Sequence, residues 1–246
     1  MTFVEKLRAA AAQNHSLLCV GLDPDPKFLP ASVGDRDNPT LYFLQHLIDA
    51  TADLVCAYKP NFAFFGALGE RGWSTLKTTL DHIPPSIPVI IDAKVGDIGN
   101  TAEHYARMFF EILGADALTV NPYMGSDAVA PFLAYREKGV FLLCLTSNKG
   151  AADFEEQELA DGPLYLRVAR KACEWNSAGN CGLVVGATQP QARDSFWDDA
   201  DLSRVWSGPA RVWLVTGRPP ERSVIARLEG AQLVAVGGGR RLYANR

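Results

Sequence analysis

Eight short apolar runs alternate along this chain with stretches of helical periodicity. Each run is rich in Val, Leu, Ile or Ala, and most end at Gly, Pro, Asp or Asn, which is typical of buried strands. They occupy residues 16–22, 54–58, 87–92, 117–120, 139–145, 182–186, 212–215 and 233–236. Because strands that alternate with helices form a parallel sheet, eight such units predict an α/β protein with a closed (β/α)8, or TIM, barrel.

The helices between these strands are expected at 3–13, from about 40, at 71–81, 102–113, 126–136, from Pro163 and at 219–228. No linker, low-complexity segment or charge block interrupts the alternation. With 48% hydrophobic residues, the chain can bury one large core. The sequence therefore predicts a single domain over residues 1–246.

Composition excludes several partners and compartments. The net charge is -4 and no basic run occurs, so we expect no nucleic-acid or membrane partner. No apolar run reaches transmembrane length, and the N-terminal stretch reads as an amphipathic helix. The five cysteines are odd in number and have no CxxC spacing, which favours a reduced, cytoplasmic protein without a metal site.

Three ionisable residues follow the third apolar run within six positions: Asp92, Lys94 and Asp97. In an extended strand, side chains two residues apart point to the same face. We therefore expect Asp92 and Lys94 to lie together where this strand ends. The carboxyl end of a buried strand is where α/β proteins carry their chemistry.

Polar and charged residues also follow the other strands. The strand-end set is Asp23, Lys59, Asp92, Lys94, Asp97, Asn121, Ser147, Thr188, Gly217 and Arg240. If the barrel closes, the first five meet at one mouth and form a candidate active site. A salt-bridge network that stabilises the barrel rim is the alternative interpretation.

A glycine run, 237–239, follows the eighth strand and precedes Arg240. Barrels often bind phosphate through backbone N–H groups after strands seven and eight. Arg240 can add a bidentate contact. The sequence thus predicts a phosphorylated small-molecule ligand, with a simple flexible turn as the alternative.

Several motifs resemble, in order, those of orotidine 5'-phosphate decarboxylases, most closely the longer, type 2 subgroup. The most specific is Asp-Ala-Lys-Val-Gly-Asp-Ile-Gly-Asn-Thr-Ala at 92–102, and the others lie at 20–24, 58–61, 120–123, 146–148 and 185–188. The resemblance extends from about residue 3 to the C-terminus. It implies cofactor-free decarboxylation of orotidine 5'-phosphate (OMP) to UMP in pyrimidine biosynthesis.

The resemblance also implies a role for each matching residue. Lys94 would donate a proton to C6 of the pyrimidine, and Asp92 would lie beside the departing carboxylate. Asp23 and Lys59 would hold ribose hydroxyls. Asp97 would reach the site of a neighbouring subunit, so a homodimer is expected. The remaining substrate contacts would come from Thr101, Ser147, Gly217, Gly239 and Arg240.

The chain departs from the family pattern after the seventh strand. The family carries a glycine-rich loop with a Gln there, and this chain reads Val-Thr-Gly-Arg-Pro-Pro at 215–220. Arg218 could supply a substitute phosphate contact or face solvent, and Gln189 is a weaker candidate. Two other functions therefore stay open: a Mg²⁺-dependent sugar-phosphate decarboxylase or aldolase of the same superfamily, and a non-catalytic nucleotide-binding barrel.

Overall fold

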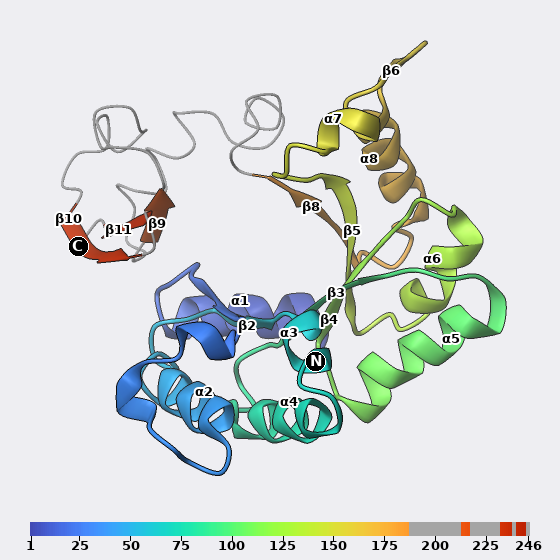
Figure 1. Ribbon diagram of the computed structural model, residues 1–246. Helices are drawn as coiled ribbons and strands as arrows, with labels where there is room; N and C mark the ends of the chain where they lie inside the picture. The colour runs from blue at the N-terminus through green and yellow to red at the C-terminus, as the bar shows by residue number, and fades with distance from the viewer. Residues whose placement is uncertain (187–212, 217–231, 238–239, 245–246) are drawn as a thin grey trace.

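The computed structural model describes residues 1–186 and the strand backbone at 213–216, 232–237 and 240–244. Its first six long strands run parallel to one another (Figure 1). They are β1 (Cys19–Leu22), β2 (Ala57–Pro60), β3 (Ile90–Val95), β4 (Ala117–Val120), β5 (Gly139–Leu145) and β8 (Cys181–Val185). Single bridges join Tyr58 to Val89 and Asn61 to Asp92, so β2 continues the sheet into β3.

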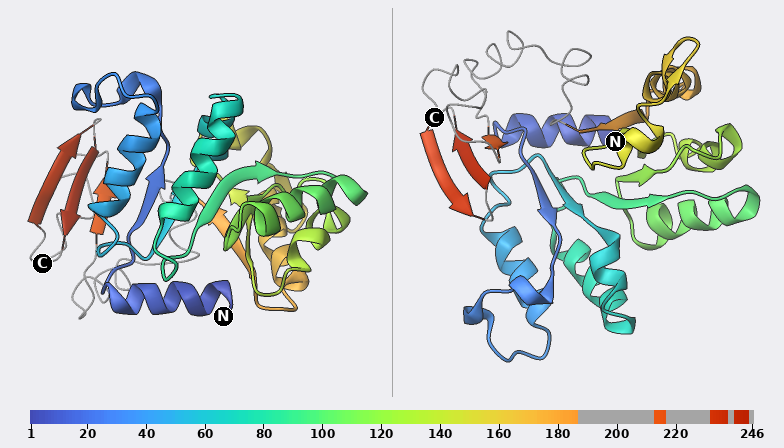
Figure 2. Two further views of the ribbon diagram at one scale, coloured as in Figure 1. Left: turned by 90° about the horizontal axis from the view of Figure 1, so that it is seen from below. Right: turned by 45° about the horizontal axis from the view of Figure 1, so that its top comes forward.

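Helices connect these strands, as the alternation predicts. The longer ones are α1 (Phe3–Gln13), α2 (Pro39–Asp49), α4 (Glu70–His82), α5 (Gly99–Arg107), α6 (Ser126–Leu133) and α8 (Leu164–Trp175). Short elements fill the loops: η1 (Pro26–Phe28), η2 (Ala31–Val33), α3 (Phe62–Gly66), η3 (Met108–Ile112), α7 (Ala151–Phe154), β6 (Glu158–Leu159) and β7 (Gly162–Pro163). Figure 2 shows α2, α4 and α5 along one side of the strands.

Helix α1 lies at the amino ends of the strands. It begins at a capping box, in which Thr2 accepts a hydrogen bond from Glu5 N–H and the Glu5 carboxylate accepts one from Thr2 N–H. Phe3 N–H then donates to Glu137 O just before β5, and Lys6 pairs with Asp116 just before β4 at 2.8 Å. The opposite end of the sheet, where the strands finish, stays available for a site.

The core consists of the inward faces of the strands and the apolar stripes of the helices. Leu22, Tyr58, Ile91, Leu118 and Leu142 are all fully buried, one from each of five neighbouring strands. Burial of such side chains is worth about 1.5–3 kcal/mol each, so these contacts hold the strand ends in register.

Strand boundaries differ from the sequence expectation at two places that matter for function. The second strand covers Ala57–Pro60 rather than 54–58, so Lys59 is inside it and pairs with Gly21 of β1. The third strand continues to Val95 rather than ending at residue 92, so Lys94 is also a strand residue and not a loop residue. Both changes move the charged groups onto rigid backbone.

The last two predicted strands exist but pair differently from the prediction. β9 (Trp213–Thr216) and β10 (Gln232–Gly237) lie on either side of β11 (Arg240–Ala244), and both are antiparallel to it. Only two residues separate β10 from β11. Such a short connection joins antiparallel strands, whereas a parallel crossover needs a dozen or more residues. The expectation that residues 212–215 and 233–236 are parallel strands beside the other six is therefore wrong for the described strands.

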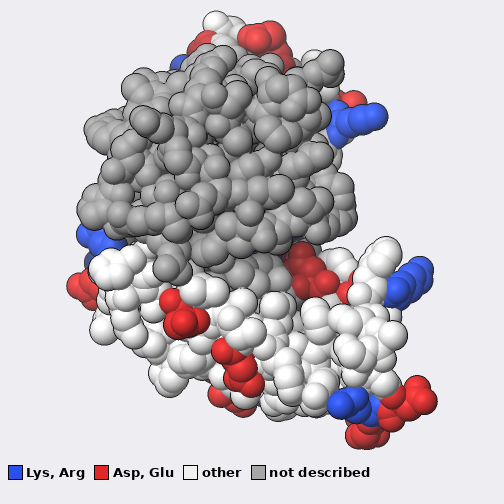
Figure 3. All heavy atoms as spheres, turned by 90° about the vertical axis from the view of Figure 1, so that its left-hand side faces the viewer, with Lys and Arg blue, Asp and Glu red and all other residues white. Residues whose placement is uncertain are grey.

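The described part of the chain carries all five cysteines, and each is a free thiol. Among the described helices, none combines the length and the apolar character that a membrane span needs. On the face drawn in Figure 3, the described Lys and Arg side chains are separated from one another and lie near acidic groups.

Candidate active site

Two lysines and one aspartate meet where β2 and β3 end. Lys59 Nζ lies 3.1 Å from Asp92 Oδ2, and Lys94 Nζ lies 2.5 Å from Asp92 Oδ1. The Asp92 side chain is 11% exposed, and that of Lys94 is 44% exposed. The carboxylate is thus enclosed between two partly exposed cations. The predicted convergence of Lys59, Asp92 and Lys94 is present in the structure.

A bulge in β3 brings Asp92 and Lys94 together. The β3–β4 register passes from Ile91–Leu118 to Val95–Val120, so residues 92–94 oppose one residue of β4. Lys94 adopts a left-handed backbone with φ of 51°, which costs a non-glycine residue about 1 kcal/mol or more. Bulges next to active sites re-aim side chains in this way. The prediction that Asp92 and Lys94 lie together is therefore correct, but a bulge, and not a regular extended strand, brings them together.

The single β4 residue that faces this bulge is Thr119. Its hydroxyl donates to Asp92 Oδ1 at 2.9 Å and accepts from Lys94 N–H at 2.9 Å. Thr119 is 5% exposed. The sequence reasoning missed this residue, although a lone hydroxyl within the apolar run 117–120 was a signal for it.

Opposing effects act on the pKa of Asp92. Burial raises it, but the hydrogen bond from Lys94, the charge and hydrogen bond of Lys59 and the hydrogen bond from Thr119 together lower it below its ordinary value. Asp92 is therefore ionised at neutral pH. Its charge supplies a fixed negative field next to the Lys94 ammonium.

The loop after β3 is constrained by its neighbour after β4. A Cβ on Gly96 would meet Asn121 O at 2.9 Å and the Met124 side chain at 3.4 Å, so only glycine fits without a shift. Asp97 follows, and its carboxylate accepts a hydrogen bond from Ile98 N–H at 2.8 Å. Within residues 1–186, Asp97 makes no ion pair with the Lys59–Asp92–Lys94 cluster.

Two further predicted residues lie at neighbouring strand ends. The exposed Asp23 follows β1, and its carboxyl group lies 3.7–3.8 Å from the position of a Cβ on Gly21, which pairs with Lys59. The exposed Ser147 follows β5, and its backbone lies 2.9–3.0 Å from the position of a Cβ on Gly186. Both therefore lie at the same end of the sheet as the charged cluster.

The other predicted substrate contacts are placed only in part. Thr101 is exposed in the first turns of α5. Gly217 and Gly239 lie outside the described residues, as do the alternatives Gln189 and Arg218. Arg240 begins β11 instead of a loop after a parallel strand, and only its backbone is described. In the described part of the chain, no group of three or more His, Cys, Asp or Glu could hold a metal ion.

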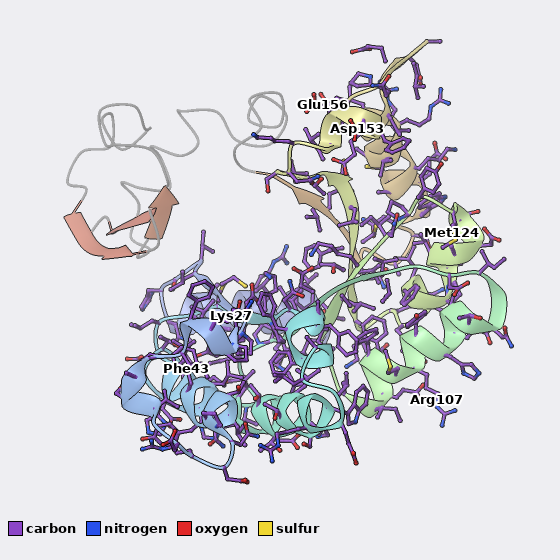
Figure 4. The ribbon with its side chains drawn as sticks, in the orientation of Figure 1. Lys27, Phe43, Arg107, Met124, Asp153 and Glu156 are labelled. Carbon is purple, nitrogen blue, oxygen red and sulfur yellow. The ribbon has the colours of Figure 1, made fainter. Side chains whose placement is uncertain are left out.

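An apolar groove of about 400 Å³ lies near the ends of β4 and β5, beside α7 and α8. Tyr123, Phe154 and Leu164 are among its lining residues. Figure 4 labels Met124, two residues before α6, and Asp153 and Glu156, in and just after α7.

Comparison with known proteins gives consistent matches. The chain matches the profile described as "Orotidine 5'-phosphate decarboxylase / HUMPS family" over residues 16–239. The orotidine 5'-phosphate decarboxylase of Azoarcus sp. (strain BH72) is 47% identical over 251 residues, covering 100% of this chain and 89% of that protein. The orotidine 5'-phosphate decarboxylase of Roseiflexus sp. (strain RS-1) is 53% identical over 194 residues, covering 78% of this chain and 71% of that protein.

A solved structure titled Leishmania donovani OMP decarboxylase superposes with a TM-score of 0.70 at 41% identity, covering 83% of this chain and 75% of that one. This likeness assigns the six parallel strands to a (β/α)8 barrel, the architecture that the strand–helix alternation predicts. The chain belongs to the orotidine 5'-phosphate decarboxylase / HUMPS family.

Proposed function

We propose that Lys94 is the proton donor, and Asp92 and Lys59 its charge partners, in the decarboxylation of OMP to UMP. This reaction, a step of pyrimidine biosynthesis, is the function that the family and the site support together. The observation that carries the proposal is an ammonium, Lys94 Nζ, held 2.5 Å from a partly buried carboxylate, Asp92, on β3.

The chemistry requires a fixed cation near C6 of the pyrimidine. When the bond between C6 and the carboxylate breaks, CO2 leaves and the electron pair stays on C6, in the plane of the ring, where the π system cannot delocalise it. The Lys94 ammonium stabilises this charge and then transfers a proton to C6. The neutral amine regains a proton from solvent, which its 44% exposed side chain can reach.

Asp92 and Lys59 prepare this step. Asp92 keeps the Lys94 ammonium at a defined position, and its negative charge lies where the substrate carboxylate would approach. Lys59 Nζ lies 3.1 Å from Asp92 Oδ2, the other oxygen of the Asp92 carboxylate, and so holds the Asp92 side chain in place. Preorganised charges of this kind need no reorganisation during the reaction.

The substrate would be held by groups around this centre. In this proposal Lys59 on β2 and Asp23, directly after the paired strand β1, bind ribose hydroxyls, and Ser147 contacts the pyrimidine. Gly217, Gly239 and Arg240 are the proposed phosphate contacts. Binding of the substrate phosphate, which lies far from C6, can order the site before the reaction.

We further propose a homodimer in which Asp97 and Thr101 complete the site of the second subunit. Two observations support this. Asp97 follows the catalytic strand but bonds to Ile98 N–H and not to Lys94 of its own chain. In addition, Ile98, Tyr123 and Met124 are exposed apolar residues of the loops after β3 and β4, which is typical of an interface. The free thiols suggest that this dimer works in the cytoplasm.

The family description also covers HUMPS proteins, so a sugar-phosphate reaction is the second candidate. The superfamily members that need Mg²⁺ place a Glu after the second strand, where this chain has Lys59. An ammonium there repels a divalent cation. Turnover of OMP that persists in EDTA, with no turnover of a keto-sugar phosphate, would exclude this candidate.

A spectrophotometric assay of OMP decarboxylation tests the main proposal. Lys94→Ala should lower kcat by at least about 10²–10⁴-fold, because the proton donor is lost. Lys77→Ala, at an exposed position on α4, is the matched control and should retain wild-type turnover. Substantial turnover by the Lys94 variant would show that another group delivers the proton.

A further inference from the structure

We propose that Thr119 is a positioning residue of this reaction, whose hydroxyl fixes Asp92 and Lys94 relative to each other. The inference rests on the proposed function, because it concerns the geometry of the proton donor. Thr119 lies in the middle of β4 and is 5% exposed. Its Oγ1 is 2.9 Å from Asp92 Oδ1 and 2.9 Å from Lys94 N.

The direction of each hydrogen bond follows from the chemistry of the partners. An ionised carboxylate only accepts, so the Thr119 hydroxyl proton points to Asp92. A backbone N–H only donates, so Lys94 N–H points to the Thr119 oxygen. One hydroxyl therefore connects the side chain of Asp92 with the main chain of Lys94. It spans the bulge at the point where the β3–β4 register shifts.

Packing alone does not require a hydroxyl at this position. The other residues of β4, Ala117, Leu118 and Val120, are buried and apolar, and a valine has nearly the same shape as a threonine. Burial of a hydroxyl is unfavourable unless it is hydrogen-bonded. Both partners of this hydroxyl belong to the charged cluster, which points to a role in the site beyond the fold.

Lys94 depends on such a fixed point because its ion pair with Asp92 restrains the ammonium but not the main chain. Its side chain is 44% exposed, and its backbone adopts φ of 51°, a conformation that non-glycine residues avoid. Without the Thr119 oxygen, the Lys94 N–H loses its partner and the bulge can relax toward an extended strand. The ammonium would then move away from the position that meets C6.

The test compares Thr119→Val, Thr119→Ala and Thr119→Ser in the full chain. Valine replaces the hydroxyl with a methyl group, alanine removes both the hydroxyl and the methyl group, and serine keeps the hydroxyl and loses only the methyl group. Thr79→Val is the matched control, because Thr79 is also buried and its hydroxyl bonds to Thr75 O on α4. For each variant, kcat and KM are measured with OMP, Kd with UMP, and the unfolding midpoint in urea.

Loss of positioning should appear in kcat and not in binding. We expect Val and Ala to lower kcat by roughly ten- to a hundred-fold, because a small misplacement of a catalytic group has effects of this size. The KM for OMP and the Kd for UMP should change by less than about three-fold, since the Thr119 hydroxyl is hydrogen-bonded to Asp92 and Lys94. Serine should restore most of the turnover. Thr79→Val should keep kcat while losing comparable stability.

The outcomes separate this inference from the proposed function. A wild-type chain that does not decarboxylate OMP would overturn both. An active wild type with kcat unchanged in the Val and Ala variants would overturn the positioning role alone. Equal losses of kcat in Thr79→Val and Thr119→Val, or no rescue by serine, would show that Thr119 serves only the fold.

Discussion

Asp92 determines the electrostatics of this site because each of its oxygens has a different cationic partner. Oδ2 faces Lys59, and Oδ1 receives both the Lys94 ammonium and the Thr119 hydroxyl. Charge-assisted hydrogen bonds of this kind are about twice as strong as neutral ones. Removing either lysine would leave the carboxylate with one cation and a less defined position.

The lowered pKa of Asp92 predicts a pH-dependent contribution to stability. A carboxyl group whose folded-state pKa is below its unfolded value of about 3.9 stabilises the fold above that pH. This stabilising contribution is lost as the pH falls through the folded-state pKa of Asp92. Urea midpoints of wild type and Asp92→Asn should therefore change in parallel above pH 5, and wild type should lose more stability between pH 5 and 2.

The control for this experiment is Asp81→Asn, which removes a carboxylate from the exposed Lys77–Asp81 pair on α4. Exposed pairs contribute little, so this variant should follow wild type over the whole pH range. If Asp92→Asn also follows wild type between pH 5 and 2, Asp92 is not stabilised by its lysines.

Residue identities in the site were largely predictable, but the way they are held was not. Asp92 and Lys94 could be paired from their spacing because they belong to one short segment. Thr119 could not, because its partners are 25 and 27 residues away and depend on the strand register. Register shifts are set by tertiary packing, which a single sequence does not reveal.

At the scale of elements, the ends of the strands carry the function. The predicted second strand ended at residue 58, before Lys59 and Pro60, and a proline cannot donate to a strand ladder. In the structure, Pro60 is the last strand residue, so Lys59 remains on the sheet. Proline is tolerated at such a position, and this tolerance explains the shifted boundary.

The end of β5 is fastened by the segment that follows it. Glu155, directly after α7, accepts a hydrogen bond from Thr146 N–H at 2.6 Å and lies 3.0 Å from the Thr146 hydroxyl. Gly186 lies against the next residue, Ser147, from the other side. The α7 segment thereby holds the strand end that carries Ser147, the proposed pyrimidine contact.

Glu155→Leu should loosen this strand end. Hydrogen bonds to a charged group contribute about 1.5–3 kcal/mol, so the free energy of unfolding should fall by an amount of that order. The KM for OMP should rise several-fold as Ser147 loses its fixed position, with a smaller change in kcat. Urea unfolding and steady-state kinetics measure the two effects.

Two variants complete this comparison. Glu155→Gln keeps one acceptor oxygen and should lie between wild type and the leucine variant. Glu156→Leu changes the neighbouring residue near α7 and should have little effect (Figure 4). If Glu155→Leu leaves both stability and KM unchanged, the hydrogen bonds to Thr146 do not hold the strand end.

At the scale of the whole molecule, the sequence predicts the six parallel strands correctly, but it does not predict the antiparallel pairing of β9, β10 and β11. The alternation identified β1 to β5 and β8, because helix and strand periods differ clearly in those segments. It missed β11, because Arg-Arg-Leu-Tyr-Ala at 240–244 has no long apolar run and follows a glycine turn signal. The antiparallel pairing of β10 with β11 follows from that missed strand.

The proposed homodimer makes each active site a product of two chains, with Lys94 from one and Asp97 from the other. Lys94→Ala and Asp97→Ala should each be nearly inactive alone. When the two are unfolded together and refolded, half of the dimers should be mixed and carry one intact site. About a quarter of the wild-type activity should then return.

A mixture of Lys94→Ala with Lys59→Ala is the matched control. Lys59 and Lys94 contact the same Asp92 within one chain, so no combination of these two variants rebuilds a complete site. This mixture should stay inactive, and size-exclusion chromatography should report a dimer for every sample. Failure of the Lys94→Ala and Asp97→Ala mixture to recover activity, while dimers form, would place Asp97 in the site of its own chain.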